Sequence, residues 1–191
     1  MPDYRRAYVP GGTFFLTIVT YQRQPIFSDR ENVARLRQAI TDVMREAPFR
    51  IPAAVVLPDH LHLLCSLPRG DSDYSRRVGR MKVLFTRSLS AHGVIPDQIS
   101  RSRLKHRESG IWQRRFWEHW VEDETDFENL LNYIHYNPVR HGLVTCPHLW
   151  PFSSFRKWVG TGFHPEHWGC CCDGRKPVLP LIAEYDEITG E

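Results

Sequence analysis

The order in which strand-like and helix-like segments follow one another constrains this fold more than any other feature of the sequence. Residues 13–20 (TFFLTIVT) are uncharged and mostly β-branched or aromatic, which is typical of a buried strand. Residues 28–31 (SDRE) form a capping box, and we expect a helix that Ser28 caps and that ends before Pro48. Its apolar residues form one stripe: Val33, Leu36, Ile40, Val43, Met44 and Ala47. The chain therefore opens with a strand and an amphipathic helix.

The middle of the chain predicts a hairpin followed by a second helix. Two short apolar runs, residues 51–57 and 60–67, are separated by the turn dipeptide Pro58-Asp59, which favours an antiparallel pair. Residues 74–91 carry apolar side chains at helical spacing. Residues 94–110 show no periodicity and are rich in basic residues, so we expect a basic loop there.

A third strand-like run and a third helix complete the pattern. Residues 111–121 (IWQRRFWEHWV) are dense in aromatic residues with period-two character, which predicts a strand. Residues 125–128 (TDFE) form a second capping box, and we expect the helix that it opens to end near Asn137, before Pro138. The apolar stripe of this helix consists of Phe127, Leu130, Leu131 and Ile134.

The resulting order, β-α-β-β-α-β-α, predicts an α+β fold. Its first six elements are the split β-α-β, ferredoxin-like arrangement, in which an antiparallel sheet carries helices on one face. The chain has 191 residues, of which 41% are hydrophobic, so it suits one domain with its own core and an extension. We place the domain over residues 1–158 and an irregular C-terminal extension over residues 159–191.

Apolar runs and cysteines bear on where such a chain would reside. The longest uncharged apolar runs are far shorter than a membrane span, and Gly11 and Gly12 interrupt the one signal-like segment, so we expect a cytoplasmic protein. The odd number of cysteines, 5, suits reduced thiols better than a disulfide framework. Cys170, Cys171 and Cys172, with His164 and His167, could bind zinc, but adjacent thiolates close a tetrahedron poorly, which favours a loosely structured tail.

Positive charge is concentrated in residues 74–115, which carry 11 Lys and Arg against 2 Asp and Glu. Such a block next to aromatic residues is the electrostatic footprint expected for a phosphate-backbone partner, although a basic stretch is more often a solvated face. The candidate DNA-binding residues are Arg76, Arg77, Arg80, Lys82, Arg87, Arg101, Arg103, Lys105, Arg114 and Arg115.

Two histidines are the first candidates for chemistry. His60 and His62 stand on either side of Leu61 at the start of a predicted strand. Because side chains alternate along a strand, both imidazoles point to one face, within reach of one divalent ion. The alternative is one packed and one exposed histidine without a ligand role.

A tyrosine and an asparagine are the second candidates. Tyr133 and Asn137 lie four residues apart and therefore share one side of the last predicted helix. Tyr133 lies about 110° from the centre of the apolar stripe, so we expect it on the flank, where a tyrosine commonly serves as an amphipathic anchor. Tyr136 is a competing candidate on the more polar side. A nucleophilic tyrosine beside a metal ion and a basic segment favours a phosphodiester substrate.

Three ordered motifs resemble one known family. Residues 57–64 (LPDHLHLL) look like the histidine-hydrophobe-histidine (HUH) motif of single-tyrosine transposases. Residues 112–119 (WQRRFWEH), 133–144 (YIHYNPVRHGLV) and 150–154 (WPFSS) closely resemble the REP-associated tyrosine transposases. The resemblance covers about residues 8–158.

The resemblance implies a monomeric or homodimeric endonuclease that acts on single-stranded DNA with hairpins formed by repetitive extragenic palindromes. His60 and His62 would bind Mg²⁺ or Mn²⁺, Asn137 would complete that site, and Tyr133 would attack the scissile phosphate. The products would be a 5′-phosphotyrosine link and a free 3′-hydroxyl, and the reverse reaction would transfer the strand. Leu57, Asp59 and His141 depart from the residues that are frequent in the family.

Two other functions stay open at the level of sequence. The chain could bind DNA hairpins without cutting them, or it could hydrolyse phosphodiesters with water while Tyr133 serves the structure. A trapped covalent protein–DNA adduct separates these functions, since only a nucleophilic tyrosine forms one.

Overall fold

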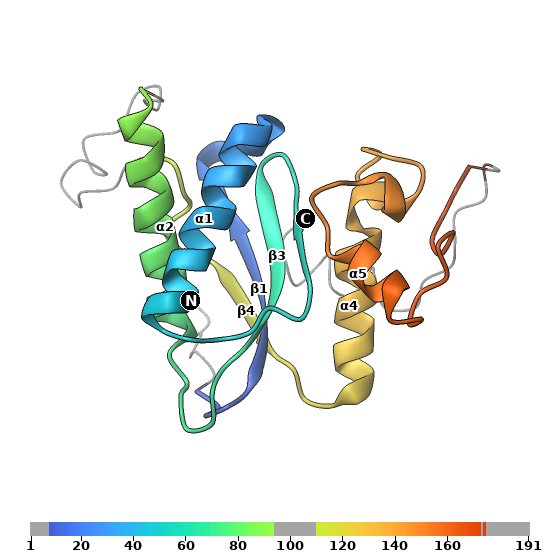
Figure 1. Cartoon of the computed structure of the whole chain (residues 1–191), viewed down its shortest axis with the longest axis horizontal. Coiled ribbons are helices and arrows are strands. Elements are labelled where there is room, and N and C mark those ends of the chain that lie inside the picture. Colours follow the sequence, from blue (N-terminus) through green and yellow to red (C-terminus); the bar gives the residue numbers. More distant parts are fainter. Residues whose placement is uncertain (1–7, 94–109, 173, 175–191) are drawn as a thin grey trace, which may run out of the picture.

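The computed structural model describes residues 8–93, 110–172 and 174, which are built around one four-stranded antiparallel sheet (Figure 1). The spatial order of the strands is β2-β3-β1-β4, so β3 and β1 form the centre of the sheet. The strands span Thr13–Val19 (β1), Ala54–Val56 (β2), His60–Ser66 (β3) and Trp117–Trp120 (β4). The α+β class and the split β-α-β order predicted from the sequence are confirmed.

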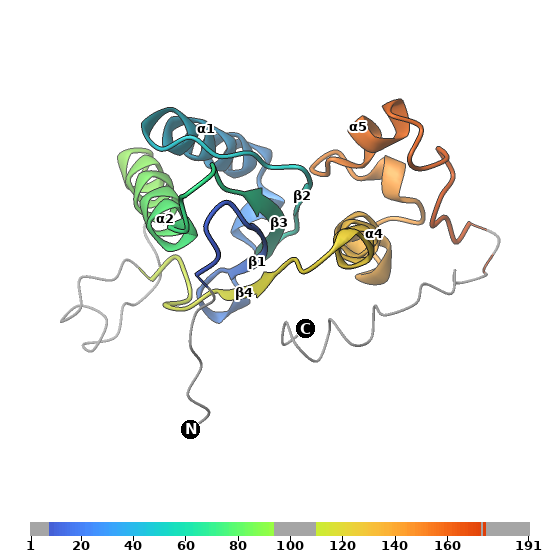
Figure 2. The same ribbon diagram turned by 90° about the horizontal axis from the view of Figure 1, so that it is seen from below.

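Helices lie on both sides of this sheet. Helices α1 and α2 cover one face, and α4 lies against the other (Figures 1 and 2). The helices span Arg30–Glu46 (α1), Tyr74–Ala91 (α2), Glu124–Arg140 (α4) and Phe155–Gly160 (α5), with 3-10 turns over Tyr21–Arg23, Ile26–Ser28 and Pro147–Leu149. Helix α2 has the predicted bounds. Within the described residues, the structure contains no helix with the length and apolarity that a membrane crossing requires.

Both predicted capping boxes are wrong in position. Asp29, not Ser28, caps α1 and accepts a hydrogen bond from the Glu31 amide, because residues 26–28 are already used in a 3-10 turn. Asp123 caps α4 and accepts from the Asp126 amide, so the helix begins before the predicted box. In each case a neighbouring aspartate takes the cap.

Two other boundaries also differ from prediction. Helix α4 continues through Pro138 to Arg140. A proline removes only one backbone hydrogen bond from a helix, and here the His141 amide closes the last turn by donating to the Asn137 carbonyl (3.0 Å). The strand predicted over residues 111–121 is shorter. Trp112 forms an isolated bridge to Thr20, residues 113–115 are exposed, and the chain rejoins the sheet only at Trp117.

Each central strand contributes to two separate cores, because successive side chains point to opposite faces. Phe14, Leu16 and Ile18 pack in the core under α1 and α2. Phe15 and Leu64 pack in a second core with α4. The two helices of the split β-α-β unit, α1 and α2, lie on one face as predicted, and α4 covers the other face.

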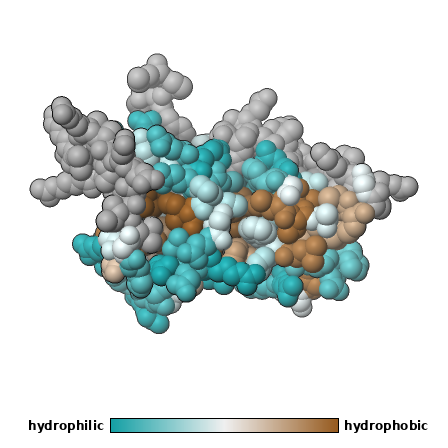
Figure 3. All heavy atoms as spheres, turned by 90° about the horizontal axis from the view of Figure 1, so that it is seen from above, coloured by the Kyte–Doolittle hydropathy of each residue, from teal (hydrophilic) through white to brown (hydrophobic). Residues whose placement is uncertain are grey.

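The chain after α4 returns to the edge of the sheet at β2. The Val56 amide donates to the Phe152 carbonyl (2.8 Å), and the Ser154 amide donates to the Ala54 carbonyl (2.8 Å). His135 of α4 is hydrogen-bonded to Ser154 Oγ (2.9 Å). The C-terminal half of α4 is consequently buried nearly all round, and apolar side chains gather on the α4 and α5 side of the surface (Figure 3).

Candidate active site

The two histidines of β3 occupy the sheet face that α4 covers. His60 and His62 are 1% and 0% exposed, and their ring centroids lie 4.9 Å apart. His62 Nδ1 is hydrogen-bonded at 2.9 Å to Oγ1 of Thr17, its register partner on β1. His60 Nδ1 is 2.6 Å from Asp59 Oδ1. Because Nδ1 of each ring is held in this way, Nε2 is the nitrogen oriented to bind a metal.

Asp59, in the turn before β3, contacts groups on two segments. Its carboxylate accepts a hydrogen bond from Arg23 Nη1 at 3.2 Å as well as contacting His60. Partial burial acts to raise the pKa of Asp59, but the hydrogen bonds and positive charge of His60 and Arg23 outweigh it and lower the pKa. The carboxylate is therefore ionised where it orients the His60 ring.

Helix α4 presents one stripe of side chains to this histidine pair. The Tyr133 ring lies 5.3 Å from the His62 ring, and the His141 ring, just after the helix, lies 5.3 Å from the His60 ring. Asn137 stands midway between Tyr133 and His141, about one helical turn from each, and so lies on the same stripe. The four sequence candidates, His60, His62, Tyr133 and Asn137, therefore come together.

The Asn137 side chain is buried in an unusual way. It is 0% exposed, and within the described part of the chain neither its amide nitrogen nor its carbonyl oxygen has a hydrogen-bond partner. A buried amide without partners costs roughly 1–3 kcal/mol, so such a group calls for a ligand or an ordered water. Two imidazoles with an amide oxygen beside them form a donor set that fits a divalent cation.

The predicted flank position of Tyr133 is wrong. Tyr133 is 1% exposed and packs in the second core, where Phe15 lies 5.7 Å from its ring. The predicted stripe consists only of strongly apolar residues, whereas the sheet and the C-terminal extension bury α4 from two sides. Arg140 Nη1 lies 3.5 Å from Tyr133 Oη, with its guanidinium 5.9 Å from the ring centre.

Sequence analysis missed four residues that contact the site: Thr17, Asp59, Arg140 and His141. Arg140 and His141 follow Tyr133 by about two helical turns, but this spacing was hidden because Pro138 was expected to end the helix. Thr17 follows only from strand register, which has no local signature in the sequence. Asp59 lies in the predicted turn, but a turn signal does not say which ring its carboxylate contacts.

Tyr136, the competing tyrosine, lies on another side of α4. Its ring is 6.4 Å from the Trp168 ring, and a Cβ at Gly169 of the extension would stand 3.2 Å from it. Burial raises the pKa of its phenol. Tyr136 is therefore part of the packing between α4 and the extension, away from the histidines.

The predicted DNA-binding residues are not one surface. Arg77 is 6% exposed, and its guanidinium binds the Asp71 carboxylate and nearby carbonyls, so it serves the fold and cannot lie on a basic surface as predicted. Arg80 makes a two-fold hydrogen bond with Glu46 of α1, both at 2.7 Å. Lys82 donates to the Gln113 carbonyl (2.9 Å). Helix α2 also lies on the sheet face opposite the histidines.

Other basic candidates are exposed or lie outside the described residues. Arg76, Arg87, Arg114 and Arg115 are exposed. Arg114 and Arg115 follow Gln113, whose amide donates to the Val19 carbonyl, and Val19 pairs with His60. These two arginines therefore stand near the histidine end of the sheet. Arg101, Arg103 and Lys105, with the predicted basic loop, lie outside the described residues.

Fold and site together define the class of protein. Residues 11–137 match the family described as transposase IS200-like. The chain is 43% identical to a Haemophilus influenzae relative and 38% identical to the REP-associated tyrosine transposase of Escherichia coli, each over 88% of this chain and 94% and 91% of the relatives. A solved REP-associated tyrosine transposase bound to a REP hairpin aligns with a TM-score of 0.73 and 37% identity, covering 88% of this chain and 91% of that one.

The chain therefore belongs to the REP-associated tyrosine transposases. The resemblance inferred from residues 57–64, 112–119, 133–144 and 150–154 is confirmed.

Proposed function

We propose that this protein cuts and rejoins single-stranded DNA beside a hairpin through a covalent link to Tyr133. The observation that carries this proposal is the position of Tyr133 on the α4 stripe, with its ring 5.3 Å from His62 of a histidine pair on β3. A phenol next to a candidate metal site is the arrangement that nucleophilic attack on a phosphodiester requires.

The proposed DNA partner is a hairpin of the REP class. The related transposase that aligns over most of the chain is bound to such a hairpin. Exposed Arg114 and Arg115 near the histidine end of the sheet supply positive charge for phosphate contacts. Either a monomer or a homodimer is compatible with this partner.

His60 and His62 would hold Mg²⁺ or Mn²⁺ through Nε2, and the Asn137 carbonyl would complete the set. When bound, such an ion polarises a phosphoryl oxygen and offsets charge that develops on the phosphate. Asp59 and Thr17 keep the two rings in the ligating orientation by holding Nδ1.

The proposed chemistry forms one bond and breaks one. Tyr133 Oη, losing its proton, attacks the phosphorus, the bond to the 3′ oxygen breaks, and that oxygen takes up a proton to leave as a 3′-hydroxyl. Arg140, 3.5 Å from Oη, provides positive charge beside the attacking oxygen. Reversal with another 3′-hydroxyl restores a phosphodiester and frees the phenol. No external energy source is needed, because the phosphotyrosine ester retains the free energy of the phosphodiester bond that was broken.

Access to Tyr133 places a requirement on this reaction. In-line attack needs Oη about 3 Å from the phosphorus, yet the side chain is 1% exposed. A phosphate can meet Oη only if α4 moves relative to β3 or if Arg140 turns away. Substrate binding is therefore expected to shift either α4 or the Arg140 side chain.

A covalent-trapping experiment tests the proposed function. A REP hairpin with a single-stranded flank, labelled at its 3′ end, is incubated with Mn²⁺ or Mg²⁺ and analysed for a denaturant-stable adduct. Wild type and Tyr136→Phe should form the adduct, and Tyr133→Phe should bind the hairpin without forming it. Peptide mapping should place the nucleotide on Tyr133. Cleavage without an adduct would instead support hydrolysis by water, and binding without cleavage would support a hairpin-binding protein.

A further inference from the structure

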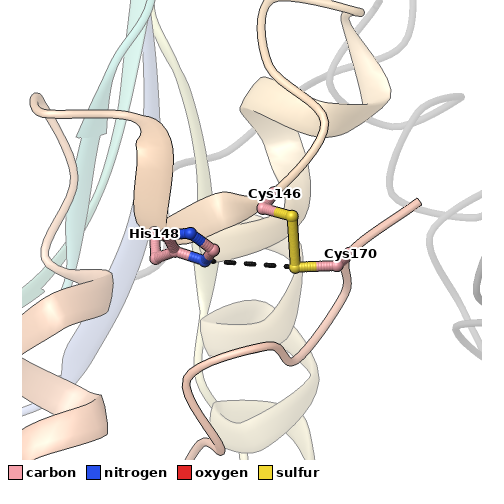
Figure 4. Close-up of side chains that lie close together, drawn as sticks. All are labelled: Cys146, His148 and Cys170. Atoms are coloured by element: carbon pink, nitrogen blue, oxygen red, sulfur yellow. Dashed lines mark hydrogen bonds between the residues drawn. A yellow bond between two sulfur atoms is a disulfide. The ribbon is translucent and has the colours of Figure 1, made fainter. Parts of the chain in front are cut away.

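A second cluster of ligating side chains lies apart from the histidine pair, where the C-terminal extension meets the loop after α4. Cys146, His148 and Cys170 offer ligand atoms that all lie within 4.8 Å of one another (Figure 4). Cys146 and Cys170 are joined as a disulfide, Cys170 Sγ is 4.0 Å from His148 Nδ1, and Cys172 Sγ is 2.9 Å from Cys146 Sγ. Two cysteine sulfurs and one imidazole thus form a compact group, and the Cys172 sulfur adjoins it through Cys146.

We propose that the reduced cluster is a structural zinc site with the ligands Cys146, His148, Cys170 and Cys172. A disulfide uses only two of these four side chains and gives no reason for the other two to converge. Three thiolates and one imidazole are a complete set for tetrahedral Zn²⁺. Thiolates around one Zn²⁺ lie about 3.7 Å apart, given Zn–S bonds of about 2.3 Å. Cys170 Sγ lies 4.0 Å from His148 Nδ1 and Cys172 Sγ lies 2.9 Å from Cys146 Sγ, so once the disulfide is reduced the sulfurs have to move apart to surround one ion.

The spacing of these ligands also avoids the adjacent thiolates that made zinc unfavourable from the sequence. Two pairs, Cys146 with His148 and Cys170 with Cys172, each skip one residue and come from separate segments. Cys171 points elsewhere, with its thiol 3.4 Å from the Thr145 carbonyl. His164, one of the ligands considered from the sequence, is hydrogen-bonded to His135 of α4 instead (3.0 Å).

The backbone holds the two pairs side by side. The Cys171 amide donates to the Thr145 carbonyl at 2.9 Å, which aligns residues 170–172 with the start of the Cys146 pair. Gly169 has φ +67°, and a Cβ there would stand 3.2 Å from Tyr136 and 3.3 Å from Pro147. Only glycine permits this close turn. Binding through His148 Nδ1 would replace its present 3.2 Å contact with the Glu166 carbonyl.

Zinc bound here would fasten the extension to the loop that follows α4. Coordination releases the thiol protons, so binding should acidify a weakly buffered solution as well as stabilise the fold. Because the extension packs against Tyr136 and His135 of α4, the site would support the outer side of the helix that carries Tyr133. This inference does not rest on the proposed function, since it concerns the ligands alone.

Cobalt substitution of the full-length chain under reducing conditions tests the site. Co²⁺ bound by thiolates gives an intense charge-transfer band that the histidine pair, which lacks sulfur, cannot produce. The band is expected in wild type, Cys171→Ser and His62→Ala, and it should weaken in Cys146→Ser and Cys170→Ser, each of which loses one of the three thiolates. Cys172→Ser should lower its intensity by about one third, because one of three thiolates is lost. Zn²⁺ should displace Co²⁺ and abolish the band.

Cys65 is not a candidate ligand, because it is buried in the core under α1 and α2, and burial raises the pKa of its thiol to about 12. Zinc content measured on the His60→Ala, His62→Ala double variant should remain one ion per chain. The absence of a thiolate band in reduced wild type would overturn the proposal, and so would a Cys146–Cys170 disulfide that persists in excess reductant. Unchanged band intensity in Cys172→Ser, with loss in His167→Ala, would refute the ligand set.

Discussion

The two faces of the sheet are built from the same strands, yet they have different contents. Under α1 and α2 the strands contribute apolar side chains such as Phe14, Leu16 and Leu61. Under α4 the alternate positions of the same strands contribute Thr17 and His62 among the apolar residues. Adjacent residues on one strand therefore serve stability on one face and chemistry on the other.

The difference shows how a small domain can bury a polar site. Buried polar groups on the α4 face cost free energy unless they are paired. Most of the buried apolar side chains lie on the α1 and α2 face, and their burial can offset that cost. On the α4 face a single helix both completes the core and carries Tyr133. That helix is buried on its outer side by the extension, so the α4 face depends on segments beyond the split β-α-β unit.

The largest expected effect comes from removing a candidate metal ligand on the α4 face. His62→Ala should lower the cleavage rate by about 10³-fold or more, since metal stabilisation is worth several kcal/mol. Hairpin affinity should stay within a few-fold, because phosphate contacts dominate binding. His92→Ala, exposed at the end of α2, is the control. Single-turnover cleavage measures the rate, and electron paramagnetic resonance measures Mn²⁺ binding. Undiminished cutting by His62→Ala in EDTA would show that a metal ion at this site has no part in cleavage.

Substituting one phenylalanine on each face compares how the two faces contribute to stability and to cleavage. Phe85→Ala, in the α1 and α2 core, should lower the free energy of unfolding by about 3–5 kcal/mol while the cleavage rate per folded molecule stays the same. Phe15→Ala should lower both, because Phe15 lies 5.4 Å from the His62 ring and 5.7 Å from the Tyr133 ring. Denaturant unfolding and single-turnover rates are the measurements. Equal catalytic losses in the two variants would contradict the separation of the faces.

The threonine that holds His62 should matter less than the ligand itself. Thr17→Val removes the hydrogen bond to Nδ1 at nearly constant volume and should weaken Mn²⁺ binding by about 10–100-fold. Thr13→Val is the matched control, since Thr13 bonds to Ser66 at the far end of the same strand pair. Titration calorimetry with Mn²⁺ distinguishes the variants, and equal affinities would show that Thr17 does not orient the ligand.

Acid should weaken the attachment of the extension to α4. Burial lowers the pKa of His164 from 6.5 to about 4. Between these pH values His164 is protonated in the unfolded chain but not in the folded chain. The stabilising contribution is complete above pH 6.5 and is lost as the pH falls toward 4. His164→Gln can still hydrogen-bond His135 but does not titrate. As the pH falls from 6.5 to 4, the Tm of His164→Gln should fall less than the Tm of wild type. Parallel Tm profiles would show that protonation of His164 does not weaken the fold.

The smallest effect concerns the basic residues. Arg114→Ala with Arg115→Ala should flatten the salt dependence of hairpin binding by up to about 1.4 in log–log slope, or about 0.7 for each phosphate that is no longer neutralised. Arg80→Ala should change the slope less, because its guanidinium is already engaged by Glu46 on the other face. Filter binding or anisotropy across salt concentrations measures both. A larger change from Arg80→Ala would place the DNA on α2.

Local patterns in the sequence determined the elements and the directions of side chains within them. Alternation along a strand predicted that His60 and His62 share a face, and helical spacing predicted that Tyr133 and Asn137 share a side. Both hold, because they depend on backbone geometry over a few residues. The bounds of α2 follow in the same way. The caps of α1 and α4 shifted because several nearby residues can cap a helix, and neighbouring turns select among them.

Only the tertiary structure decided which faces meet. Tyr133 reaches His62 because α4 packs on the face opposite α1 and α2, a choice made by the sheet, the β4 connection and the extension together. The same packing buries Tyr133 and brings Arg140 to its phenol, while on the other side of the sheet Arg77 is turned into the fold. Cys146 and Cys170 meet for the same reason. Contacts between distant segments depend on summed packing energies, for which a single sequence has no local periodic signal.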